Sequence, residues 1–290
     1  MKTFVVSDSE SSEGISSDRA VCLNSPGGSY MAGREIAQQV HDRGLTTRIN
    51  AKSECFSACA LIFMAGRING AESDTVSRYL HVDGKLGFHA PYFDLARDET
   101  INGEQAANLV RLSSIVISDF ISFGSSRSIF NIQPMISSSL LAQMLAMGPD
   151  ELSVVDTVEK AARWNIQLEG IRGSELVGRE GAVRACLNFQ AWLSDEPSKM
   201  DSLSYYLEGK EDLVSYNRGD KVEVFSKIQT GGMEDRHCLV SRSRLPVESL
   251  AICSADDFNG MRIGDCADGF SYWVPWYYAL APSSPLAALK

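Results

Sequence analysis

The sequence predicts an α/β fold followed by a small β-rich domain, and three observations carry this prediction. Residues 20–49 follow the order strand, Gly-Gly turn, helix, strand, with a crossover that suits a parallel βαβ unit. An almost wholly apolar helix is expected within Cys55–Ala65. Beyond about Gly170 the pattern changes to short strands between Gly-rich turns. We therefore expect a polar N-terminal segment (1–19), an α/β domain (20–170) and a small β-rich domain (171–290).

The composition excludes several classes of partner. Hydrophobic residues make up 44% of the chain and charged residues 22%, as is ordinary for a soluble globular protein. The net charge is −10 and no run of Lys and Arg occurs, so nucleic acid and anionic membrane surfaces are poor partners. The longest apolar run, Ala58–Ala65, is too short for a membrane span, and the start of the chain lacks the features of a signal peptide.

Cysteine content bears on compartment and on metal binding. The seven cysteines include no CxxC pair, so we expect no zinc site. Seven is a high number for a cytosolic protein and favours a periplasmic or secreted location, whereas the missing signal peptide leaves a cytoplasmic one open. Cys55 and Cys59 flank Ser57 and would brace it as a disulfide if their Cα atoms approach within about 7 Å.

The elements of the first domain can be assigned in chain order. Thr3–Val6 and Ala20–Leu23 are expected to be short strands, and the second ends at the turn Asn24-Ser25-Pro26-Gly27-Gly28. Apolar residues then recur at helical spacing from Ala32 to Val40, and Gly44 is a natural helix stop before the strand Leu45–Ile49. We expect Arg67–Lys85 to be irregular. The remaining elements are a strand at Leu86–His89 and helices at Glu104–Phe123, Pro134–Met147 and Val158–Ile166.

The second domain shows a repeated strand pattern. The expected strands are Leu213–Tyr216, Lys221–Ser226, Cys238–Ser241, Ser249–Cys253, Met261–Ile263 and Tyr272–Trp276.

Two features of the first domain indicate acyl-transfer chemistry. The Gly27-Gly28 turn permits close backbone approach, so its amides could bind an oxyanion, although the same dipeptide also serves as a plain tight turn. Ser57 is expected at a strand-to-helix turn that exposes Oγ, with the Ala58 amide as a further oxyanion donor. The alternative for Ser57 is an ordinary helix N-cap.

A serine nucleophile needs a base, and the chain has only four histidines. His89 is the one expected to end a buried strand of the first domain, which suits a general base, although a satisfied core histidine has the same pattern. The carboxylate that would orient it stays open: Asp150 and Asp156 are both candidates among several acidic residues.

The order of these motifs resembles the proteolytic subunit of the Clp protease and its relatives in the Clp/crotonase superfamily. The resemblance rests on Asn24-Ser25-Pro26-Gly27-Gly28, on Ser57 before a buried helix, and on Leu86-Gly87-Phe88-His89, and it covers about residues 20–166. Cys55-Phe56-Ser57-Ala58-Cys59-Ala60 resembles a branch of bacterial exported proteins.

The resemblance implies a spiral of βαβ units and a serine peptidase site. Ser57 matches the nucleophile, His89 the base, and Gly27, Gly28 and Ala58 the oxyanion hole, while Asp150 is the nearest match to the third residue and Asp156 the reserve. It implies a peptide or protein substrate, no cofactor and no metal, and homo-oligomers in some branches.

We therefore expect a serine-type peptide hydrolase. One alternative is a non-catalytic binding or assembly module, suggested by the aromatic run of residues 272–278, which could equally be core. Another is acyl-CoA chemistry of the crotonase kind, which shares the oxyanion turn but does not need the Ser57–His89 pair.

Overall fold

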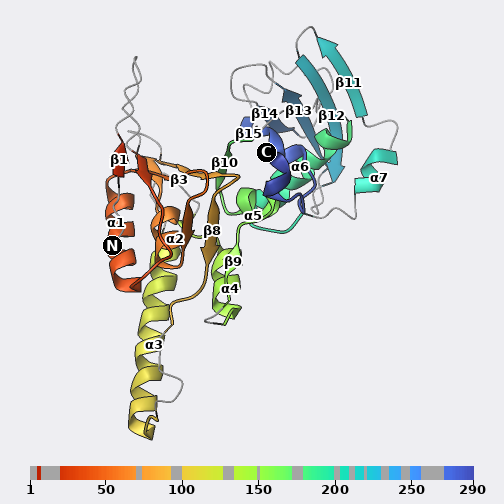
Figure 1. Ribbon diagram of the computed structural model, residues 1–290. Helices are drawn as coiled ribbons and strands as arrows, with labels where there is room; N and C mark the ends of the chain where they lie inside the picture. Colours follow the sequence, from red (N-terminus) through yellow and green to blue (C-terminus); the bar gives the residue numbers. More distant parts are fainter. Residues whose placement is uncertain are drawn as a thin grey trace. The chain divides into compact units, whose positions relative to one another are not determined.

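A computed structural model describes residues 5–7, 20–69, 74–92, 100–126, 134–148, 151–171, 179–198, 203–208, 213–218, 221–229, 235–242, 249–255 and 271–290. The chain divides into two compact units (Figure 1). The first comprises Met1–Asp156, Trp164–Ile171 and Lys290, and the second Thr157–Arg163 and Arg172–Leu289.

The larger sheet of the first unit is mainly parallel. Its strand order is β1-β2-β3-β7-β10, in which β1 pairs antiparallel with β2 and the other neighbours pair in parallel. The bounds are β1 Val5–Ser7, β2 Ala20–Cys22, β3 Thr46–Ile49, β7 Arg78–His81 and β10 Gln167–Glu169. Mixed helices and parallel strands establish the α/β class expected from the sequence.

A second, three-stranded sheet carries the candidate site. It has the order β4-β8-β9, with β4 (Glu54–Phe56) parallel to β8 (Lys85–Phe88) and β9 (Ser153–Val154) antiparallel to β8. Ser25 extends it by a parallel bridge to Cys55. The chain therefore passes twice from the larger sheet to the smaller one, from β3 to β4 and from β7 to β8.

The helix α2 (Ala58–Met64) contacts strands of both sheets, and α1 (Tyr30–Asp42) packs against α2. α1 follows the Gly-Gly turn, and α2 follows Ser57. The two helices meet at Gly33, where an added Cβ would lie 2.8 Å from the Cβ of Ala58. From Cys59 to Met64 every residue of α2 is buried, as the apolar composition predicts.

α3 (Gly103–Gly124) is a long helix that runs away from the sheets of the first unit (Figure 1). A capping box between Asn102 and Gln105 begins it. Only its last turns are buried, while Val110 and Ile115 remain exposed. By length and composition alone, α3 is the one helix among the described residues that could cross a membrane. α4 (Ser138–Ala146) follows it.

The stretch Arg67–Lys85 is not irregular, contrary to the expectation from its polar composition. β5 (Arg67–Asn69) pairs antiparallel with β6 (Asp74–Val76), and β7 lies inside the larger sheet. The polar residue that misled the prediction is Arg78, which is buried at 1% exposure within β7.

The second unit is built on an antiparallel sheet whose strands follow chain order, β11 to β15. Their bounds are Leu213–Arg218, Lys221–Gln229, Asp235–Arg242, Ser249–Ala255 and Ser271–Pro275, so five of the six expected strands are present. The sixth, Met261–Ile263, lies outside the described residues.

Helices that the sequence did not predict complete this unit. They are α6 (Arg179–Leu193) and α7 (Leu203–Glu208). The unit also contains α5 (Val158–Arg163) and the 3-10 turns Trp276–Ala279 and Leu286–Leu289. Ala182, Val183 and Cys186 of α6 pack with Leu250 and Ile252 of β14. In the aromatic run, Val274 and Tyr277 are buried, and Trp276 and Tyr278 pack against the same core. These four residues of the run therefore contribute to the core of the unit.

Candidate active site

Ser57 stands at the turn from β4 into α2, in a conformation that non-glycine residues avoid. Its φ is 58° and its ψ is −125°. Its amide donates to the carbonyl oxygen of Gly87 at 3.1 Å, and its own carbonyl accepts from the Ala60 amide at 2.9 Å, which begins the helix. A strained strand-to-helix turn of this kind presents a nucleophilic serine in hydrolases.

The side chain of Ser57 does not act as a helix cap. Ser57 occupies the N-cap position of α2, yet its hydroxyl accepts no capping hydrogen bond from the helix. The ordinary N-cap role therefore does not account for this serine.

Gly27 lies directly against Ser57. A Cβ added to Gly27 would lie 2.7 Å from the Cβ of Ser57 and 2.8 Å from the carbonyl oxygen of Phe56. The φ of Gly27 is 111° and that of Gly28 is 151°. Glycine is thus required at position 27 by both space and backbone conformation.

The amides around Ser57 differ in their hydrogen bonds. The Gly27 amide donates to the hydroxyl of Ser25 at 3.2 Å, a contact with no sequence signature. Within the described residues, the Gly28 and Ala58 amides donate no hydrogen bond. Gly28 and Ala58 are therefore the donors left available for an oxyanion.

His89 follows β8, the strand beside β4. Phe56 of β4 pairs with Gly87 of β8 in parallel, so Ser57 and His89 both lie at the carboxyl ends of neighbouring strands. His89 is partly exposed, and its ring centroid lies 5.2 Å from that of Tyr92. Unlike a core histidine, it can be reached by a ligand.

The tautomer of His89 suits a general base. Its Nδ1 lies 2.7 Å from the carbonyl oxygen of Ala90, and because a carbonyl can only accept, Nδ1 carries the proton. Nε2 then presents a lone pair. No hydrogen bond joins Ser57 Oγ to His89 among the described residues, and such bonds often form only when substrate is bound.

Of the two carboxylate candidates, the structure describes Asp156 alone. Asp150 lies outside the described residues. Ser153 of β9 pairs with Phe88, and the Val155 amide donates to Leu86, so Asp156 falls beside the start of β8. That position is about 13 Å along the strand from His89. The side chain of Ser153 is buried, and its Oγ has no hydrogen-bond partner among the residues that the structure describes.

A disulfide joins Cys55 to Cys59 across Ser57. The two Cα atoms are 5.2 Å apart, within the reach required by the sequence-based prediction. Cys186 is also disulfide-bonded, and Cys22 is a free, partly buried thiol. In the part of the chain that the structure describes, no three His, Cys, Asp or Glu side chains gather where they could hold a metal ion.

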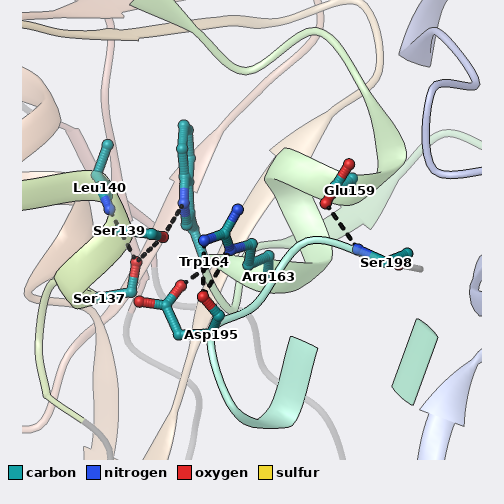
Figure 2. A network of polar contacts seen from close by, with 8 residues as sticks. All are labelled: Ser137, Ser139, Leu140, Glu159, Arg163, Trp164, Asp195 and Ser198. Carbon is teal, nitrogen blue, oxygen red and sulfur yellow. Dashed lines mark hydrogen bonds and ion pairs between the residues drawn. The ribbon is translucent and has the colours of Figure 1, made fainter. Parts of the chain in front are cut away.

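A polar network supports the strand that ends at His89. The Trp164 indole packs edge-on against Phe88 of β8, with ring centroids 6.0 Å apart. Its Nε1 donates to the Ser139 hydroxyl at 3.1 Å (Figure 2). The Ser139 hydroxyl in turn lies 3.4 Å from the Ser137 hydroxyl at the start of α4.

A separate polar contact lies in the second unit, where Arg163 donates to the carbonyl oxygen of Asp195 at 2.7 Å (Figure 2).

Comparison with known proteins finds similarity to solved structures. No protein-family model matches the chain, and no curated protein matches it in sequence. Among solved structures, the chain is similar to the ClpP1 N165D mutant from Listeria monocytogenes, with 15% identity and a TM-score of 0.32 over 52% of this chain and 74% of that chain.

Proposed function

We propose that this protein is a serine-type hydrolase that uses Ser57 as the nucleophile to cleave peptide bonds. The observation that carries the proposal is the backbone of Ser57, at φ 58° and ψ −125°, with its hydroxyl not used to cap the helix. Strained backbone gathers at functional sites because folding alone gives no reason to keep it. His89 on the neighbouring strand supplies the base that a serine requires.

The chemistry follows from the positions of these groups. Ser57 Oγ attacks the substrate carbonyl, and His89 Nε2 takes the hydroxyl proton. The Gly28 and Ala58 amides hold the oxyanion, while Gly27 allows the turn to lie against Ser57. His89 returns the proton to the leaving amine, and water then hydrolyses the acyl-enzyme by the same route in reverse.

The group that orients His89 is part of the proposal. His89 Nδ1 donates its proton in a hydrogen bond to the Ala90 carbonyl oxygen, with 2.7 Å between the nitrogen and the oxygen. A carboxylate from Asp150 would strengthen this orientation, and Asp156 is the weaker reserve because the β8–β9 register places it about 13 Å along the strand from His89. Labelling of Asp150→Asn and Asp156→Asn variants distinguishes a triad from a dyad, since only the residue that orients His89 should slow the reaction at neutral pH.

The finer assignment of fold and compartment belongs to the same proposal. The two passes from the larger sheet to the smaller one support a Clp/crotonase-type spiral for the first unit. The Cys55–Cys59 disulfide and the disulfide at Cys186 support an oxidising compartment, the periplasm or the cell exterior. Possible self-association is checked by sedimentation of the same sample.

The test is labelling with a fluorophosphonate serine-hydrolase probe. We expect the parent to label, and Ser57→Ala and His89→Ala to lose about 10³-fold or more of the labelling rate. Ser122→Ala, which removes an exposed hydroxyl from α3, is the matched control and should label like the parent. A folded parent that does not label, or a Ser57→Ala variant that labels equally fast, would contradict the proposal.

A further inference from the structure

The conformation of Ser57 needs an explanation in the surrounding structure. A serine at φ 58° and ψ −125° lies outside the regions that ordinary residues occupy. Such a conformation persists only where neighbouring contacts enforce it. The question is which contact holds the two sides of this turn together.

The Cys55–Cys59 disulfide connects those two sides directly. Cys55 is the middle residue of β4, and Cys59 lies in the first turn of α2. Their Cα atoms are 5.2 Å apart, whereas an extended span of four residues covers about 13 Å. The bond therefore requires the chain to reverse between them, and Ser57 is the residue at the centre of that reversal.

The other contacts of the turn are non-covalent, and the Ser57 carbonyl oxygen itself accepts from the Ala60 amide of the helix at 2.9 Å. On the strand side, the Phe56 amide donates to Ser25 and the Ser57 amide donates to Gly87, both at 3.1 Å. On the helix side, Ala58 packs against Gly33 of α1. These contacts hold β4 in its sheet and α2 against α1, and the disulfide adds a covalent side-chain crosslink between strand and helix.

We propose that the Cys55–Cys59 disulfide is a positioning element that holds Ser57 in its reactive backbone geometry, so that the site works only in the oxidised protein. This rests on the proposed function for its catalytic consequence, although the effect on the backbone does not. Both cysteines are buried, with Cys55 at 0% and Cys59 at 3% exposure, so a reductant in solution has little access to the bond.

The redox step is simple to balance. A dithiol reductant supplies two electrons and two protons, the S–S bond breaks, and Cys55 and Cys59 each become a thiol. The dithiol leaves as its own cyclic disulfide. Ser57 is then free to relax toward an ordinary conformation, which misplaces Oγ.

The experiment compares the parent with a Cys55→Ala/Cys59→Ala variant. We expect the fluorophosphonate labelling rate to fall roughly tenfold to hundredfold, the loss that matches release of a strained residue. Cys22→Ala removes a thiol that forms no disulfide and should label like the parent. Hydrogen exchange is measured on the same proteins, and we expect faster exchange in peptides covering 54–62 but not in β3 or β7.

Each outcome has a defined meaning. A parent that labels and a double variant that labels at the same rate overturn the proposal, and so does unchanged exchange over 54–62. If the parent does not label but exchange over 54–62 rises in the double variant, the proposed hydrolase function fails while the positioning role stands. If the double variant does not fold, the folded parent is treated with increasing dithiol instead. Loss of labelling must then follow the appearance of thiols at Cys55 and Cys59, and labelling that survives their reduction overturns the proposal.

Discussion

At the scale of single residues, the close contact between Gly27 and Ser57 makes the first prediction. In Gly27→Ala the new Cβ would lie 2.7 Å from the Ser57 Cβ, at a φ of 111° that alanine rarely adopts. We expect the variant to lose about 1–3 kcal/mol of stability and most of its labelling rate, because the turn must move away from Ser57. Thermal unfolding and probe labelling measure the two effects.

The control for Gly27→Ala is Gly103→Ala. A Cβ at Gly103, in the first turn of α3, meets nothing within 4 Å. This variant should melt and label like the parent. A Gly27→Ala protein that keeps the full labelling rate would show that close approach of this glycine is unnecessary.

The environment of Arg78 allows a second prediction at the residue scale. Its guanidinium is fully buried and donates to the carbonyl oxygens of Met64, Met135, Trp164 and Asn165 at 2.7–3.1 Å. Burial lowers the pKa of Arg78 to about 9, so the group remains charged at pH 7. Four carbonyls satisfy a cation that has no carboxylate partner among the described residues.

Arg78→Met removes all of these donors at once. The loss leaves buried carbonyls unpaired, and we expect about 2–4 kcal/mol of destabilisation after the relieved desolvation of the charge is allowed for. The midpoint temperature of thermal unfolding should fall by roughly 10 °C. Arg78→Lys, which keeps a charge but fewer donors, should fall in between. Arg111→Met, an exposed site on α3, serves as the control.

At the scale of elements, polar and aromatic contacts join α1 to α3, and Arg34 of α1 contributes an ion pair with Asp119 at 3.5 Å and a position 4.2 Å from the Phe123 ring centroid. Tyr30, the first residue of α1, donates its hydroxyl to Asp119 of α3 at 2.7 Å. Burial, with the added effect of Asp119, raises the pKa of Tyr30, so the hydroxyl stays protonated at physiological pH. Phe120 packs edge-on against the Tyr30 ring, with centroids 6.3 Å apart.

Tyr30→Phe tests the polar part of this contact. A partly buried hydrogen bond to a carboxylate stabilises by about 1–2 kcal/mol, so the unfolding midpoint should fall by about 3–6 °C. Tyr92→Phe removes the hydroxyl of an exposed tyrosine and should change the midpoint little. Equal midpoints for Tyr30→Phe and the parent would mean that Asp119 contributes nothing through this bond.

How far the elements follow from sequence depends on how cleanly apolar residues repeat. α1, α2 and the strands of the second unit have regular patterns and lie close to the predicted bounds. The sequence analysis missed β7 because an arginine at position 78 suggests an exposed segment. In the structure, Arg78 donates to backbone carbonyl oxygens, and these hydrogen bonds allow it to be buried. α6 was missed because Gly181, inside its first turn, extends a run of glycines that reads as a linker.

The part of the candidate site that depends on strand order could be predicted from the sequence. Turn signals place Gly27 and Ser57 after strands, and parallel pairing then brings Ser57 and His89 to the same end of the sheet. The role of the Ala90 carbonyl and of the Ser25 hydroxyl depends on local geometry with no sequence pattern. The third residue depends on how β9, only two residues long, pairs with β8.

At the scale of the whole molecule, the state of the cysteines makes the last prediction. Cys55 and Cys59 are bonded to each other in the first unit, Cys186 is disulfide-bonded in the second, and Cys22 is free. Crosslinks of this kind persist only where the surroundings are oxidising. Protein made in such a compartment, unfolded and alkylated without reductant, should therefore be modified at Cys22 and not at Cys55, Cys59 or Cys186.

Peptide mapping by mass spectrometry reads this pattern directly. The control is a sample reduced before alkylation, in which all seven cysteines should react. Alkylated Cys55 and Cys59 in unreduced protein would contradict the oxidised turn around Ser57, whereas a Cys55–Cys59 link in protein made in a reducing cytosol would mean that burial alone protects the bond.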